Sequence, residues 1–260
     1  MDWMEVNGAS LRYQLSGAGA ATVLLVHELG GAMESWDEVL PHFEKEFRVL
    51  RYDQRGFGLS EKASVLTLDG ILGDVRGLLD ALGIGSCHVA GSAMGAAIGI
   101  ALASRLPERV KSLAVSSPTS CAALPPAFIG HLEARGRLIR EGGMRAIADA
   151  AFTMSYPAVL RGNAARFERF RNRWLANDPE SFMAINRLVP TDLSPELHRI
   201  RCPSLVMGCA GDSIRTPADT RKVAEAIPNA RFVEVDSGHF MAIQTPELFA
   251  SHVIPFFRES

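Results

Sequence analysis

The chain has 260 residues, of which 47% are hydrophobic, and 27 basic side chains against 29 acidic ones give a net charge of -2. A nearly neutral chain without long runs of like charge has no electrostatic footprint for nucleic acid. Its apolar stretches are shorter than the roughly 20 residues that cross a bilayer, and its acidic N-terminus does not resemble a signal peptide. We therefore expect a cytoplasmic protein without nucleic-acid or membrane partners, and its oligomeric state is left open.

Short apolar runs alternate with amphipathic helical patterns, which is typical of an α/β protein with a parallel sheet covered on both faces. A hairpin is predicted first, around the turn at Asn7 and Gly8. In chain order, the predicted strands are 1–6, 10–15, 22–26, 47–52, 86–90, 110–116, 204–208 and 231–235. The predicted helices between them are 34–43, 67–82, 94–105, 218–226 and 246–257.

The alternation stops between about residues 120 and 195, where only helical patterns occur, over 128–141, 144–152 and 163–176. Because the sheet needs strands from both sides of this insert, we interpret residues 120–195 as a helical cap. Residues 1–119 and 196–260 then form the core, an eight-stranded and mostly parallel sheet with the cap inserted after its sixth strand.

Three segments after predicted strands could carry chemistry. The first is Gly91-Ser92-Ala93-Met94-Gly95, a glycine-flanked turn between a strand and a helix. Asp212 follows a later strand, and His239 follows the last one. Each has a plain structural explanation, as a glycine-rich turn, a turn-capping aspartate and a loop histidine. Together they have the order in which a nucleophile, an acid and a base occur in one class of hydrolases.

Two further stretches support that interpretation. Residues 47–60 read Phe-Arg-Val-Leu-Arg-Tyr-Asp-Gln-Arg-Gly-Phe-Gly-Leu-Ser, and residues 106–110 read Leu-Pro-Glu-Arg-Val. With these segments the chain resembles the α/β-hydrolase superfamily over essentially its whole length, and within it the 3-oxoadipate enol-lactonase-like hydrolases. The resemblance implies a hydrolase that uses no cofactor and no metal.

The resemblance also implies roles for single residues. Position 93 is the nucleophile position, Asp212 orients His239, and His239 is the general base. The backbone N–H groups of Leu29 and Met94 form the oxyanion hole. The chain departs from the family at Ala93, which has no nucleophilic atom. Glu28 also stands where a small residue is usual, so we expect its carboxylate to point away from the hole, toward a cation.

Ala93 leaves three interpretations open. It can be a serine-to-alanine exchange that disables a serine hydrolase, which is the reading we favour. It can belong to a natural binding protein that kept the fold and lost turnover. In the third, His239 and Asp212 activate water or take a proton from the substrate directly. Ser92 is a poor substitute nucleophile, because a motif centred on it would put Ala90 and Met94 where the glycines belong.

The insert points to a substrate class. Ten arginines lie from Arg135 to Arg187 without a lysine, and arginine suits bidentate binding of carboxylates. Many of these arginines are equally explained as solvated helix faces. The resemblance independently implies a small substrate that bears a carboxylate, such as an intermediate of aromatic catabolism. As pocket-lining residues we name Ser92, Gly30, Trp36 and Trp174.

Cysteine spacing adds no further site. Cys87, Cys121, Cys202 and Cys209 lie far apart, and no pair has the Cys-X-X-Cys spacing. Neither a zinc site nor a redox pair is indicated, so free thiols in a reducing compartment are expected.

Overall fold

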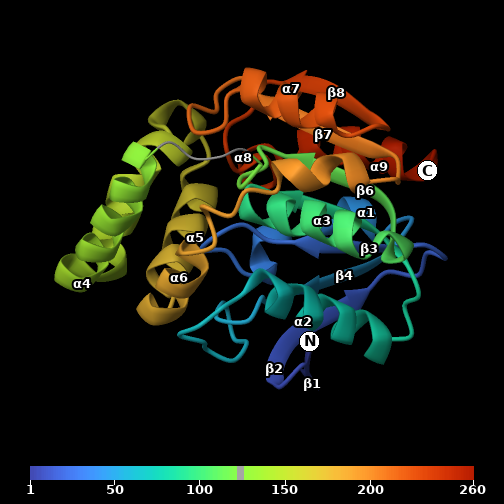
Figure 1. The fold of residues 1–260 in the computed structure, drawn as a ribbon, viewed down its shortest axis with the longest axis horizontal. Coiled ribbons are helices and arrows are strands. Elements are labelled where there is room, and N and C mark those ends of the chain that lie inside the picture. Colours follow the sequence, from blue (N-terminus) through green and yellow to red (C-terminus); the bar gives the residue numbers. More distant parts are fainter. Residues whose placement is uncertain (122–125) are drawn as a thin grey trace.

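The sheet is the centre of the molecule, and its strands occur where the sequence predicts them. The computed structural model describes residues 1–121 and 126–260, without the side chains of 126–129 and 131. The described strands are β1 (Asp2–Val6), β2 (Ala9–Ser16), β3 (Thr22–Val26), β4 (Arg48–Tyr52), β5 (Cys87–Ser92), β6 (Val110–Ser116), β7 (Ser204–Cys209) and β8 (Ala230–Val235). They form one eight-stranded sheet in the order β1-β2-β4-β3-β5-β6-β7-β8 (Figure 1).

The sheet is antiparallel only at its first edge. β1 and β2 form the predicted hairpin, and its turn residues Asn7 and Gly8 have φ values of 51° and 70°. Two consecutive positive φ values are the requirement of a type I′ turn, which matches the twist of the strands. β2 pairs antiparallel with β4, and every later pair is parallel. The carboxyl ends of these parallel strands therefore lie along one edge of the sheet.

Helices cover both faces of the sheet and gather beyond that edge. The described helices are η1 (Met33–Trp36), α1 (Leu40–Phe43), α2 (Leu68–Ala81), α3 (Met94–Arg105), η2 (Pro107–Arg109), α4 (Pro126–Ser155), η3 (Ala158–Leu160), α5 (Ala164–Leu175), α6 (Pro179–Asn186), η4 (Ser194–Arg199), α7 (Pro217–Ala226), α8 (Met241–Gln244) and α9 (Pro246–Arg258). One buried cluster joins α2, α3 and α7 to the sheet, and a second joins α1 and α9 to its other face. α4, α5 and α6 lie together on one side in Figure 1. Within the described residues, none of these helices has the length and apolar character needed to cross a membrane.

The described helices agree with the sequence predictions in part, and short elements such as η4 and α8 were not predicted. The predicted helix over 34–43 is split into η1 and α1, because Pro41 has no N–H and its ring would clash within a continuous helix. The predicted break between helices 128–141 and 144–152 is found within α4 at Gly143, whose φ of 65° and ψ of -166° are not helical. α6 was not predicted, although Asp178 caps it by accepting a bond from the Ser181 N–H.

Glu38 links α5, one helix of the insert, to the part of the chain that forms the sheet. Its carboxylate accepts hydrogen bonds from Arg166 Nε at 2.8 Å and Arg169 Nη2 at 2.6 Å, both on α5. Arg166 also donates to the Gln244 carbonyl oxygen at 3.1 Å. Burial acts to raise the pKa of Glu38, but the hydrogen bonds and charges of the two arginines outweigh it and hold this pKa below the ordinary 4.5.

A pH-dependent stability difference follows from this contact. Glu38→Gln should lower the free energy of unfolding near neutral pH by on the order of 1 kcal/mol, the upper range for a partly exposed ion pair. Because the folded-state pKa of Glu38 is depressed, its contribution is present above the unfolded value of 4.5 and is lost as the pH falls through the folded value. Urea unfolding of both proteins at neutral pH and at about pH 4 measures this. An equal difference at both pH values would contradict the assignment.

Candidate active site

Ala93 occupies a strained turn between β5 and α3. Its backbone has φ 53° and ψ -114°, a conformation that costs a residue with a side chain on the order of 1–3 kcal/mol. The Ala93 N–H donates to the Ser116 carbonyl at 3.0 Å, and the Ala93 carbonyl accepts from the Thr119 N–H at 3.3 Å. The turn therefore keeps the geometry that presents a nucleophile, although the residue carries only a methyl group.

The glycines on either side of the turn are required by close backbone contacts. A Cβ atom on Gly91 would lie 2.4 Å from the Gly95 carbonyl oxygen. A Cβ atom on Gly95 would lie 2.1 Å from the Val26 carbonyl oxygen. Both distances are far shorter than any van der Waals contact, so the flanking positions of the pentapeptide tolerate no side chain.

Asp212 and His239 are brought together from the ends of β7 and β8. His239 Nδ1 lies 2.8 Å from Asp212 Oδ2, and both side chains are buried. The other carboxylate oxygen, Oδ1, accepts from the N–H groups of Ile214 at 2.8 Å and Arg215 at 2.9 Å. The Asp212 carboxylate is thus fixed on both sides and fixes the imidazole in turn.

The charge state of Asp212 follows from these contacts. Burial acts to raise the pKa of Asp212, but the charge of His239, its hydrogen bond and the Arg215 N–H outweigh burial and lower it below the usual value. An ionised Asp212 accepts the Nδ1 proton of His239, so the lone pair of the neutral imidazole is on Nε2. This is the tautomer that a general base needs.

A cavity of about 360 Å³ lies over these residues, within the size range of small-molecule sites. From residues 1–119 and 196–260, its walls contain Leu29, Ala93, Met94, Thr119, Ile214, Arg215, His239 and Phe240. The insert contributes Arg135, Leu138, Ile147, Ala150, Ala151, Met154, Ser155, Trp174 and Val189. The walls are mainly apolar, so the few polar groups among them decide what can bind.

Leu29 and Met94 both face this cavity, as the oxyanion-hole assignment requires. Met94 is the first residue of α3, so its N–H has no acceptor within the helix. Among the hydrogen bonds of the described residues, none uses the N–H of Leu29 or Met94. Two backbone donors are therefore available beside Ala93 and His239.

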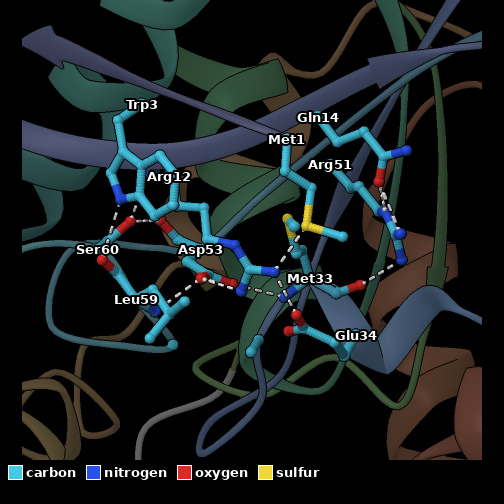
Figure 2. A network of polar contacts seen from close by, with 12 residues as sticks. Met1, Trp3, Arg12, Gln14, Met33, Glu34, Arg51, Asp53, Leu59 and Ser60 are labelled. Atoms are coloured by element: carbon cyan, nitrogen blue, oxygen red, sulfur yellow. Dashed lines mark hydrogen bonds and ion pairs between the residues drawn. The ribbon is translucent and has the colours of Figure 1, made fainter.

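The loop that carries Leu29 is held by the buried carboxylate of Asp53. Asp53 accepts from the N–H groups of Met33 at 2.7 Å and Leu59 at 2.8 Å and from Arg12 Nη1 at 3.2 Å (Figure 2). Arg12 also donates to Glu34 Oε1 at 2.6 Å. The network joins the start of η1 to β2 and to the loop after β4, so the backbone leading back to Leu29 is anchored at its end.

His27 anchors the start of the same loop. Its Nε2 accepts from the Gln54 N–H at 3.0 Å, and its Nδ1 lies 2.8 Å from the Glu28 carbonyl oxygen. Since Nε2 accepts, Nδ1 is the protonated nitrogen and donates to Glu28. With both ends of the loop fixed, little reorganisation is needed to present the Leu29 N–H.

The structure places three of the four expected lining residues away from the cavity or in another role. Ser92 lies behind the turn, where its hydroxyl accepts from the Ser116 hydroxyl at 2.9 Å. Trp36 packs against Phe249 in the buried cluster that joins α1 and α9 to the sheet. Gly30 faces the insert, because a Cβ atom there would lie 2.7 Å from the Trp174 indole. Of the four, Trp174 lines the cavity.

Glu28 points away from the cavity, but its expected cation is not found. Its buried carboxylate accepts from the Ser35 hydroxyl at 2.9 Å. No ion pair of the described residues includes Glu28. The carboxylate packs on Gly31, where a Cβ atom would lie 2.4 Å from Oε1.

Arg135 is the functional candidate that sequence patterns did not single out among the ten arginines. It reaches the cavity from α4, with its guanidinium 5.9 Å from the centre of the Phe182 ring. No ion pair of the described residues includes it, and the side chains outside the described set carry no carboxylate. Burial lowers the pKa of Arg135 to about 10, so it remains a cation at neutral pH.

None of the other arginines of the insert is among the described residues that line the cavity. Arg166 and Arg169 pair with Glu38, and Arg171 pairs with Asp149. Arg215, outside the insert, also lines the cavity. The binding space thus holds two cations and, among its described lining residues, no carboxylate.

Comparison with known proteins agrees with this architecture. A family model described as the alpha/beta hydrolase fold matches residues 21–246. The chain belongs to the α/β-hydrolase family. A relative from Caulobacter sp. (strain K31), named carbamate hydrolase RutD, is 32% identical over 243 residues that cover 90% of each chain. The 3-oxoadipate enol-lactonase 2 of Acinetobacter baylyi is 27% identical over 252 residues, covering 95% of this chain and 93% of the relative.

Solved structures give the same result for the fold. The enol-lactonase from Burkholderia xenovorans LB400 superposes with a TM-score of 0.92 and 31% identity, covering 99% of this chain and all of the other. A hydrolase from Pseudomonas aeruginosa PA01 has a TM-score of 0.90 and 30% identity, covering 98% and 97% of the two chains. The predicted membership of the superfamily, its eight-stranded sheet and its enol-lactonase-like relatives are confirmed.

Proposed function

We propose that this chain is a serine-hydrolase scaffold for a small carboxylate-bearing ester, lactone or amide, and that Ala93 lets it bind this substrate without forming an acyl-enzyme. The observation that carries the proposal is the buried His239–Asp212 pair, which shares a cavity with a strained residue 93 and two free N–H donors. Each part serves acyl transfer, and the nucleophilic oxygen is the part that Ala93 lacks.

The roles follow from the geometry. A substrate carbonyl oxygen would accept from the N–H groups of Leu29 and Met94, which places its carbon beside the Ala93 methyl group. With serine at position 93, His239 would take the hydroxyl proton and return it to the leaving group. The names of the relatives, carbamate hydrolase and enol-lactonase, support acyl compounds of this kind.

The carboxylate in the proposal rests on Arg135 and Arg215. Both side chains are half-buried, and neither has a described counterion. A bound anion would stabilise such cations in a mainly apolar cavity, because a charge that loses water needs a partner. Arginine binds a carboxylate through two parallel N–H bonds. A monoanionic acyl substrate would therefore offset one of the two positive charges that line the cavity.

Arg135→Met tests this anion site. The variant keeps most of the apolar volume and removes the charge, so it should weaken binding of monomethyl adipate by about 10- to 100-fold, the value of a hydrogen bond to a charged group. Binding of the neutral dimethyl ester should change little. Titration calorimetry on the Ala93 protein measures the affinity of both ligands, since no acyl-enzyme can form at position 93.

The matched control is Arg137→Met, which removes an exposed arginine from the same helix that is not among the lining residues. Its affinity for both ligands should equal that of the parent. If Arg135→Met weakened both esters equally, Arg135 would shape the cavity without recognising charge.

A further inference from the structure

The chain as it stands retains every catalytic group of the site except the nucleophile. His239 Nδ1 is bound to Asp212, which leaves Nε2 as the basic nitrogen. No hydrogen bond of the described residues reaches His239 Nε2. Since His239 and Ala93 line the same cavity, this nitrogen and the methyl group border one space.

The oxyanion site is independent of residue 93's side chain. The donors are the backbone N–H groups of Leu29 and Met94, whose positions depend on the strained turn and on the Asp53 network. Ala93 keeps the turn at φ 53°. A carbonyl carbon bound there would be polarised whether or not a hydroxyl is present.

We propose that the Ala93 protein is itself a slow hydrolase in which water attacks the substrate directly, a step that rests on the function proposed above. His239 Nε2 takes a proton from a water molecule beside the Ala93 methyl group, and the water oxygen forms a bond to the acyl carbon. The carbonyl electron pair moves to the oxygen held by Leu29 and Met94. When the tetrahedral intermediate collapses, the bond to the leaving alkoxide breaks, and the imidazolium gives that oxygen its proton.

The products are an acid and an alcohol, and no covalent enzyme intermediate forms. The expected size follows from what remains: an oxyanion hole with bound substrate retains roughly 10³–10⁴-fold catalysis over water when triad members are lost. Activity should thus be measurable above the spontaneous rate.

The experiment measures p-nitrophenyl acetate hydrolysis by the Ala93 protein after treatment with a fluorophosphonate, which inactivates any contaminating serine hydrolase. We expect turnover more than about 10³-fold above the uncatalysed rate, because His239 adds to what the oxyanion hole supplies. No burst of p-nitrophenol should occur, and peptide mass spectrometry should find no acetyl adduct on residue 93 or Ser92. His239→Gln should reduce this turnover by at least about 10²-fold, the contribution of a positioned general base, and leave only what the oxyanion hole supplies. His198→Gln, an exposed histidine in η4, should leave it unchanged.

Asp212→Asn provides a second variant if His239→Gln does not fold, because it disturbs the tautomer of His239 and should also remove most of the turnover. Loss of all activity after fluorophosphonate, or full activity in both folded variants, would overturn the proposal. If the Ala93 protein showed no turnover but Ala93→Ser gained hydrolase activity, the proposed hydrolase function would stand. If Ala93→Ser gained no activity either, that function would be wrong as well.

Discussion

Ala93→Ser should convert the protein into a hydrolase that forms an acyl-enzyme. The turn at Ala93 already has the strained backbone conformation that presents a nucleophile, and His239 lines the same cavity. Restoring the missing triad member should raise kcat on short activated esters by at least about 10³-fold, since losing one costs several orders of magnitude. The measurement is p-nitrophenyl ester hydrolysis together with stoichiometric labelling by a fluorophosphonate.

The control for this experiment is Ser92→Ala in the Ala93→Ser background. Ser92 lies behind the turn and hydrogen-bonds with Ser116, so labelling should persist without it. The Ala93 protein itself should not be labelled. If Ala93→Ser gained neither labelling nor activity, the site would be a binding site on a hydrolase fold, and the hydrolase proposal would be wrong.

Asp53→Ala should be the most destabilising of the substitutions considered. Asp53 is fully buried and accepts from two backbone N–H groups and from Arg12, which is itself 6% exposed. Removing the carboxylate leaves the two N–H groups without their acceptor and leaves Arg12 with Glu34 as its remaining carboxylate partner. Breaking a buried ion pair costs about 3–5 kcal/mol. Urea unfolding monitored by fluorescence measures the loss of unfolding free energy.

The comparison variant is Asp80→Ala, which removes the partner of Arg109 in an ion pair whose carboxylate is 59% exposed. Its cost should stay below about 1 kcal/mol, as is usual for surface pairs. A similar cost for the two substitutions would show that the Asp53 network does not hold the loop of Leu29. In folded Asp53→Asn, which retains one acceptor oxygen, ligand affinity should fall less than in Asp53→Ala.

The active-site residues that the sequence predicted share one property: each stands at the end of a strand. Ala93, Asp212 and His239 follow β5, β7 and β8, and the carboxyl ends of parallel strands meet at one edge of a sheet. Chain order and strand patterns were therefore enough to bring them together. Their roles in catalysis stay predictions until the variants above are measured.

The lining residues were less predictable for a physical reason. Trp36 and Trp174 have the same apolar character, but Trp36 lies in the core on one face of the sheet and Trp174 on the cavity wall. Gly30 suggested a loop close to a substrate, whereas its missing side chain makes room for Trp174. Composition does not say which apolar residue covers which face, because that depends on how the insert docks.

The sequence by itself determined the fold class, the chain order of residue 93, Asp212 and His239 after their strands, and the absence of a nucleophilic atom at position 93. Strand periodicity, glycine placement and side-chain identity are local properties, so they can be read without the tertiary structure. Only the tertiary structure decided that Arg135 enters the cavity while Arg166 and Arg169 pair with Glu38. All three are arginines on helices of one insert. Their difference comes from which carboxylate each can reach once α4 and α5 are packed, and electrostatic pairing between distant segments is not written in either segment alone.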